Sequence, residues 1–154
     1  MIKIWLTALT ILLPWSLPAS FAADPHDHGS GGTDTQLTLD HGQKWKGDQP
    51  LRQSMTNIQT LMKTNLTAIH DNKLSPEKYR ELGLGIKKET DHIFKNCKLA
   101  PKADQMLHLI LVKILKAQSA FSSQDSTVST HDAAVLVLTA LDEYGKYFDH
   151  PGWK

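Results

Sequence analysis

The sequence predicts an all-α protein: an antiparallel, up-down-up-down four-helix bundle with a flexible N-terminal arm. Apolar residues recur at three- and four-residue steps through four segments that follow residue 48, as they do along one face of a helix. Serine or proline, which suit a helix start, stands at the beginning of every segment. The connections between the segments are short, which favours antiparallel packing of neighbouring helices.

Residues 1–22 have the pattern of a secretory signal. Lys3 gives a basic start, and the apolar stretch over residues 4–13 is too short to span a bilayer. The Ser-Phe-Ala sequence at residues 20–22 fits the small-x-small cleavage rule, so we expect the cut after Ala22. An uncleaved membrane anchor is the alternative, which two prolines inside the segment disfavour. We therefore expect a periplasmic protein that has no membrane segment once the signal is removed.

Residues 23–48 form a polar arm that contains several glycines and histidines. This composition cannot bury a core, so we expect the first part of the arm to be mobile. Leu37, Leu39 and Trp45 predict that the second part docks on the helices. The four-helix bundle itself is predicted over residues 49–154.

The first helix is predicted over residues 51–70, with Pro50 in its opening turn. The second helix begins after Ser75, which caps it, and runs to about Cys97. Two glycines lie inside it, and they indicate close packing or a bend, because each costs a helix roughly 1 kcal/mol relative to alanine. The inner positions of these helices are Leu51, Met55, Ile58, Met62 and Ile69, then Tyr79, Leu82, Ile86, Ile93 and Cys97.

The third helix is predicted over residues 101–121, and a polar loop follows over residues 122–127. Ser129 and Asp132 have the spacing of a capping box, which predicts the start of the fourth helix. A proline-glycine pair at residues 151–152 ends that helix. The inner positions are Ala103, Leu107, Ile110, Ile114, Ala117 and Phe121, then Ala134, Val137, Leu141, Tyr144 and Phe148.

Charge and motifs argue against several classes of function. Removal of the signal takes away Lys3 and leaves 16 basic and 16 acidic residues, a balance with no electrostatic footprint for nucleic acid or an anionic membrane. The sequence contains no nucleophile elbow, phosphate-binding loop, dinucleotide fingerprint or His-Glu-x-x-His motif. We therefore expect a protein that is not an enzyme.

Side chains that can bind metal are predicted to meet at one end of the bundle. In an up-down-up-down bundle, the starts of the first and third helices lie beside the finishes of the second and fourth. Asp104 precedes His108 by four residues, so its carboxylate shares a helix face with the imidazole and can orient it as a ligand. The five candidate ligands at this end are Met55, His92, Cys97, His108 and His150.

Thioether, thiolate and imidazole ligands together suit copper, haem iron or zinc better than calcium or magnesium, and we favour copper. His26 and His28 in the arm can add a second, weaker metal contact. Each candidate also has a structural alternative, because methionine and cysteine fill cores and a histidine at a helix end can cap it. Cys97 is the only cysteine, so it is buried, a ligand, or the link of a dimer.

Two short segments resemble those of cytochrome b562, a family of small exported four-helix bundles. Residues 51–58, which include Met55, resemble its first-helix segment, and residues 147–150, which end in His150, resemble its last-helix segment. The resemblance implies an electron carrier with a b-type haem held by Met55 and His150. Pro151 follows His150 and drives it away from helical dihedrals. The absence of a Cys-x-x-Cys-His sequence excludes covalent c-type attachment.

A longer part of the chain is similar to uncharacterised periplasmic proteins that are helical and of the same build. The similarity lies around Trp45, residues 96–99, residues 103–104, residues 107–108 and residues 148–153, and covers most of the mature chain. It implies the four-helix fold and no particular role.

Three functions stay open on the sequence alone. The first is a periplasmic metal handler whose ligands come from the five residues at the end of the bundle. The second is a haem electron carrier that uses Met55 and His150. The third is a metal-free interaction scaffold, with Cys97, Trp45 or Trp153 on the surface that meets a protein partner.

Overall fold

The computed structural model of the protein describes residues 36–122 and 127–154. The predicted signal peptide and its cleavage site lie outside the described residues, as do His26, His28 and most of the predicted loop over residues 122–127. The described part of the chain forms four long helices and one pair of very short strands, so the protein is all-α, as predicted.

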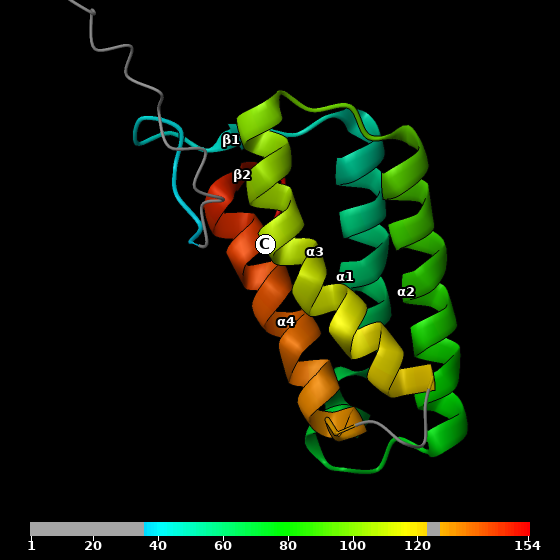
Figure 1. The fold of residues 1–154 in the computed structure, drawn as a ribbon. Coiled ribbons are helices and arrows are strands. Elements are labelled where there is room, and N and C mark those ends of the chain that lie inside the picture. The colour runs from blue at the N-terminus through cyan, green and yellow to red at the C-terminus, as the bar shows by residue number, and fades with distance from the viewer. Residues whose placement is uncertain (1–35, 123–126) are drawn as a thin grey trace, which may run out of the picture. The chain divides into compact units, whose positions relative to one another are not determined.

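The helices lie side by side along most of their length (Figure 1). Each one begins and ends close to the bounds predicted from the sequence. In chain order the elements are β1 (Trp45–Lys46), α1 (Gln49–His70), α2 (Pro76–Asn96), α3 (Pro101–Ser122), α4 (Thr130–Tyr147) and β2 (Phe148–Asp149).

Side-chain caps fix the starts of three helices. Ser75 and Ser129 cap α2 and α4 as predicted, because their hydroxyls accept hydrogen bonds from the backbone N–H groups three residues later. The helix α1 begins two residues before the predicted start, since the carboxylate of Asp48 accepts the backbone N–H of Leu51 at 2.9 Å. Asp48 therefore does for α1 what a serine does for α2 and α4.

Polar contacts join each helix to the next one along the chain. The Asp48 carboxylate, at the start of α1, accepts the backbone N–H of Lys98, just after α2, at 2.7 Å. The hydroxyl of Thr90 in α2 donates to the side-chain oxygen of Gln118 in α3 at 3.2 Å. An ion pair between Lys113 and Glu143 then joins α3 to α4. The start of α1 thus lies beside the end of α2.

The core lies along the inner faces of the four helices. Its largest fully buried side chains include Tyr144, Phe148, Met55, Ile58, Ile86 and Ile110. The predicted close packing at Gly83 in α2 is present, because a Cβ at this position would stand 2.8 Å from the Cβ of Phe121 in α3. A glycine is therefore required where α2 approaches α3.

The second part of the N-terminal arm packs on the helices. Leu37 and Trp45 contact the core as predicted, whereas Leu39 remains 41% exposed. The Trp45 indole N–H donates to the carbonyl of Thr38 at 2.6 Å. The backbone N–H and the hydroxyl of Thr38 approach the buried thioether of Met106 in α3 at 3.4 and 3.6 Å. A methionine sulfur in α3 thus acts as the docking point for this segment.

The chain leaves α4 at Tyr147, three residues before the predicted end at His150, and continues as a strand. Strand β2 pairs in parallel with β1, with Trp45 opposite Phe148 and Lys46 opposite Asp149. A two-residue strand is too short to show periodicity in a sequence, so the β1–β2 pair was not predicted. The pairing carries the C-terminal residues away from the axis of α4 and back toward α1.

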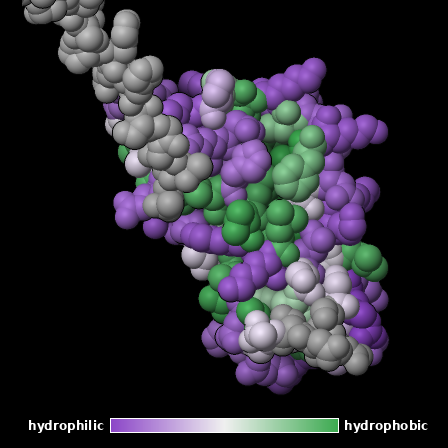
Figure 2. Space-filling view, in the orientation of Figure 1, coloured by the Kyte–Doolittle hydropathy of each residue, from purple (hydrophilic) through white to green (hydrophobic). Residues whose placement is uncertain are grey.

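Apolar side chains are also present on the surface. Figure 2 shows hydrophobic residues in the middle of one face, bordered by hydrophilic ones. Single exposed apolar residues are normal, and a contiguous hollow lined by several of them is more informative. The exposed large apolar side chains of the described residues are Leu39, Leu66, Leu84, Phe94, Val112 and Val135.

Candidate binding site

Asp48 organises the end of the helical body at which we predicted a ligand cluster. One of its oxygens accepts the Leu51 backbone N–H and the Cys97 thiol, and the other accepts the Lys98 backbone N–H. The Sγ to Oδ1 distance is 3.5 Å. We call this region, defined by Asp48, Cys97, Tyr144 and His150, the capped end.

The thiol of Cys97 is half-buried and protonated. Burial, and then the negative charge of Asp48, raise the pKa of the Cys97 thiol to about 12. Metal ligation and disulfide exchange both require the thiolate. In this arrangement Cys97 is a hydrogen-bond donor that helps to tie the end of α2 to the start of α1.

His150 bridges α4 and α1. Its Nδ1 lies 3.1 Å from the phenol oxygen of Tyr144, and its Nε2 lies 3.4 Å from the hydroxyl of Thr56. Burial, and then the Arg52 guanidinium, lower the pKa of His150 below its ordinary value. A neutral imidazole donates through one nitrogen and accepts through the other, so it can make both bonds at once.

Two of the candidate ligands, His92 and His150, contact different sides of α1. Nδ1 of His92 lies 3.0 Å from the hydroxyl of Ser54, whereas His150 lies against Thr56. Residues two apart are roughly 200° apart around a helix, so the two imidazoles stand on opposite sides of α1. Met55, between Ser54 and Thr56, is fully buried in the core.

His108 and Asp104 lie together, as the four-residue spacing predicted. His108 Nδ1 stands 2.9 Å from the backbone carbonyl of Asp104 and 3.4 Å from its carboxylate. A carbonyl only accepts, so Nδ1 carries the proton and the lone pair of a neutral ring is on Nε2. The His108 side chain is 58% exposed, and that lone pair is available to solvent.

The structure brings Cys97 and His150 to the capped end, but it distributes the predicted ligands over several faces. Within residues 36–122 and 127–154, no group of three or more histidine, cysteine, aspartate or glutamate side chains is arranged to hold a metal ion.

The residues that follow α4 form a C-terminal strap, residues 148–154, that crosses to α1. Asp149 pairs with Lys46 at 2.6 Å, and the ring of Trp153 packs edge-on against Tyr144 at a centroid distance of 4.8 Å. Gly152 has a φ of 81°, in the left-handed region that favours glycine. This turn directs Trp153 onto the last turns of α4.

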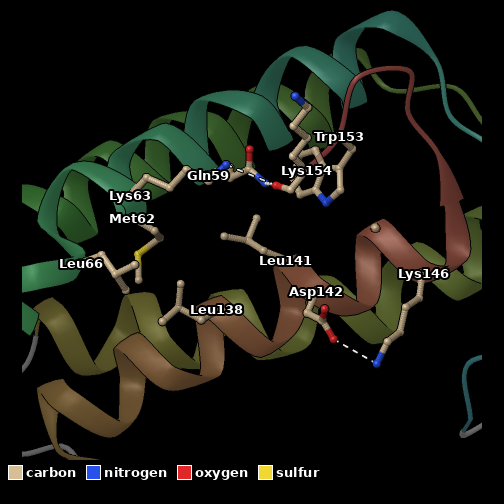
Figure 3. A pocket seen from close by; sticks show the side chains of 11 residues that line it. Gln59, Met62, Lys63, Leu66, Leu138, Leu141, Asp142, Lys146, Trp153 and Lys154 are labelled. Atoms are coloured by element: carbon tan, nitrogen blue, oxygen red, sulfur yellow. Dashed lines mark hydrogen bonds and ion pairs between the residues drawn. The ribbon is translucent and has the colours of Figure 1, made fainter. Parts of the chain in front are cut away.

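A groove runs between α1 and α4, and the strap closes one end of it (Figure 3). Its volume is about 420 Å³, within the range of small-ligand pockets. The apolar floor consists of Met62 and Leu66 from α1 and Leu138 and Leu141 from α4, which point toward one another across the gap. We call this hollow the α1/α4 groove.

Three lysines and one aspartate border the α1/α4 groove. Lys63 belongs to α1, Lys146 to α4 and Lys154 to the strap, and Asp142 pairs with Lys146 at 3.0 Å. The backbone oxygen of Lys154 accepts hydrogen bonds from the Gln59 amide at 2.9 Å and from the Lys63 ammonium at 3.2 Å. Lysine side chains and acceptor oxygens thus both border the apolar floor.

Met62 and Leu141 are buried core residues, as predicted, and their place on the inner stripes gave no sign of the groove. Sequence reasoning also attached no role to Gly145, where a Cβ would stand 2.5 Å from Nε1 of Trp153. One available signal was Leu66, an apolar residue beside the predicted inner positions of the first helix. It remains 42% exposed at the mouth of the groove.

No helix among residues 36–122 and 127–154 is long and apolar enough to cross a bilayer. No protein-family model, curated protein or solved structure matches the chain. A functional conclusion therefore depends on the residues and geometry of the chain itself.

Proposed function

We propose that the protein is a non-catalytic binding protein that holds a fatty carboxylate, a single alkyl chain with an anionic head, in the α1/α4 groove. The observation that carries the proposal is the combination of an apolar floor with a lysine-bearing rim in one hollow. A purely non-polar ligand would not interact favourably with the lysines, and a small inorganic anion would not contact the leucines.

The size of the groove supports a single chain. Its α1 wall extends from Gln59 to Leu66, a distance of about 10 Å at a rise of 1.5 Å per residue. Each methylene group that leaves water contributes about 0.8 kcal/mol, or roughly a fourfold gain in affinity. A medium-length chain would therefore gain affinity with each methylene group that it buries in the groove.

The charges of the rim support an anionic head. Lys63 uses one of its three N–H donors on the backbone oxygen of Lys154, so two remain for a ligand. Lys146 is paired with Asp142, which leaves Lys63 and Lys154 as the cations nearest to the strap. The carboxylate would lie at this end, with the chain pointing toward Leu66.

The proposal includes the wider setting of the molecule. We infer an antiparallel up-down-up-down bundle, which the contact between the start of α1 and the end of α2 supports. With the signal predicted over residues 1–22, the protein would work in the periplasm. The chain offers no catalytic motif, which is consistent with a carrier or a sensor.

Calorimetric titration of the protein with decanoate tests the proposal. We expect saturable binding of one decanoate per chain, below the concentration at which decanoate forms micelles. Leu66→Gln should weaken binding about tenfold, since the loss of roughly 50 Å² of apolar contact corresponds to about 1.3 kcal/mol. Leu84→Gln is the matched control, because Leu84 is 65% exposed on α2 and lies outside the groove.

The absence of saturable binding would reject the proposal. Equal losses in the two leucine variants would reject the groove as the site, because only Leu66 lines it. Unfolding curves of both variants show whether a loss of binding is a loss of folded protein.

Soft-metal binding, with copper favoured, is a second candidate, and one observation favours it. The hydrogen bond from His108 Nδ1 to the Asp104 carbonyl leaves the lone pair on Nε2, which is the tautomer of many metal-ligating histidines, and the side chain is 58% exposed. Further ligands would have to come from a rearranged capped end or from a second chain. Elemental analysis after purification without chelators tests this candidate, and unchanged metal content in Cys97→Ser/His108→Ala would remove that ligand set.

A further inference from the structure

The C-terminal strap is fixed to the helical body at three places. Asp149 forms an ion pair with Lys46, and His150 lies between Tyr144 and Thr56. The indole of Trp153 then packs against the backbone of α4 at Gly145. These contacts come before Lys154, and they determine where Lys154 lies.

Lys154 in turn positions a cation of α1. Its backbone oxygen accepts a hydrogen bond from the Lys63 ammonium at 3.2 Å and from the Gln59 amide at 2.9 Å (Figure 3). A lysine side chain has four rotatable bonds and ordinarily extends into water. This hydrogen bond instead holds the Lys63 ammonium at the strap end of the groove.

The geometry points to the strap, with Trp153 as its positioning residue, as the element that selects an anionic head group over a neutral one. The inference rests on the proposed function, and it assigns the two parts of the ligand to different parts of the protein. The helices α1 and α4 hold the alkyl chain, and the strap assembles the cationic site for the carboxylate. Displacement of the strap should therefore remove selectivity for charge, whereas the four apolar residues of the floor remain in place.

Gly145 gives a way to displace the strap without altering any residue of the apolar floor. A Cβ at position 145 would stand 2.5 Å from Nε1 and 2.6 Å from Cδ1 of Trp153, distances that real Cβ atoms do not show. In Gly145→Ala the rigid indole must leave, whereas the helix itself gains, because alanine is a better helix former than glycine. Gly85→Ala is the matched control: its Cβ would stand 2.9 Å from the end of the flexible Leu61 side chain, which can move aside.

The experiment measures dissociation constants for decanoate and decanol in the wild type, Gly145→Ala and Gly85→Ala. We expect the wild type and Gly85→Ala to prefer decanoate roughly tenfold, as charge-assisted hydrogen bonds allow. In Gly145→Ala the preference should be lost, so that decanoate binds no more tightly than decanol; the ratio of the two constants is the readout, because Trp153 also lines the groove. A simple loss of structure would weaken both ligands together.

Lys63→Gln provides a second test that does not disturb the packing of Trp153. Glutamine keeps a donor for the Lys154 oxygen and removes the charge, so this variant should also lose the preference for decanoate. Retention of the preference in folded Gly145→Ala, or in Lys63→Gln, would overturn the inference. If the wild type bound neither ligand, the proposed function would fail, and the role of the strap with it.

Discussion

The phenol oxygen of Tyr144 lies 3.1 Å from Nδ1 of His150, and this contact joins the last turn of α4 to the strap that leaves it. Tyr144 is fully buried, and burial raises the pKa of its phenol well above the ordinary value. The Tyr144 phenol therefore stays protonated over the ordinary pH range. It needs a partner in the protein, because a buried hydroxyl without one costs free energy.

Tyr144→Phe should destabilise the protein by about 1 kcal/mol, the usual net value of one buried hydrogen bond. The ring still fills its place against Phe148, so packing changes little. Thermal unfolding measures the effect, with an expected fall in Tm of roughly 3–5 °C for a domain of this size. Tyr147→Phe is the control, since Tyr147 is half-buried and its phenol makes no hydrogen bond within the described residues. Equal changes in both variants would contradict a role for the Tyr144–His150 contact.

Stability should fall as the pH drops through the range in which histidine titrates. Burial and Arg52 lower the pKa of His150 in the folded protein, so the unfolded chain, with an ordinary pKa of 6.5, binds its proton more readily. The stabilisation is therefore complete above about pH 6.5 and is lost as the pH falls from there toward the folded pKa. Urea unfolding at a series of pH values from about 7.5 to 5 measures this dependence.

His150→Gln isolates the contribution of this histidine from those of the others. Glutamine can still reach Tyr144 or Thr56 but does not titrate, so the pH dependence of stability should flatten relative to the wild type. The slope is the informative quantity, because the substitution also shifts the absolute stability. An unchanged slope would mean that the pKa of His150 does not differ between the folded and unfolded states.

The parts of the fold that depend on local sequence were predicted well. The caps at Ser75 and Ser129 follow from hydroxyl chemistry within one turn, and the burial of Met55 follows from its place on an apolar stripe. The β1–β2 pair and the fit of Trp153 on Gly145 join residues that only the finished fold brings together. No local sequence pattern in β1, β2 or the residues around Gly145 and Trp153 indicates which distant residues they will contact.

The candidate site shows the same division more sharply. Sequence reasoning placed His92 and His150 at the same end of the molecule, which follows from counting residues along the helices. Direction around the bundle is set by side-chain packing, and it puts His92 against Ser54 and His150 against Thr56. Residues at the same end of the molecule can therefore stand on opposite sides of α1.

Cys97 should react slowly with thiol reagents. With a thiol pKa of about 12, the thiolate is a very small fraction at pH 8, so alkylation by iodoacetamide should be at least about a hundredfold slower than in the unfolded chain. Mass spectrometry of samples quenched over time, with and without denaturant, gives both rates. Similar rates would show an accessible thiolate and would favour Cys97 as a metal ligand or as the link of a dimer.

Asp48→Ala should be the most damaging single substitution at the capped end. The side chain accepts from the Leu51 and Lys98 backbone N–H groups and from the Cys97 thiol, so its removal leaves three donors without this partner. We expect a loss of about 2–3 kcal/mol, measured by guanidinium unfolding. Ser75→Ala, which removes a cap that serves only α2, should cost about 1 kcal/mol.

Asp48→Asn separates the two tasks of this residue. Its amide has one accepting oxygen, which can cap α1 through Leu51, and an NH₂ group that cannot accept from Lys98. Its stability should therefore fall between those of the wild type and Asp48→Ala, with the deficit arising from the tie between α1 and α2. If Asp48→Ala cost no more than Ser75→Ala, the contacts to Lys98 and Cys97 would contribute nothing, and Asp48 would be only a helix cap.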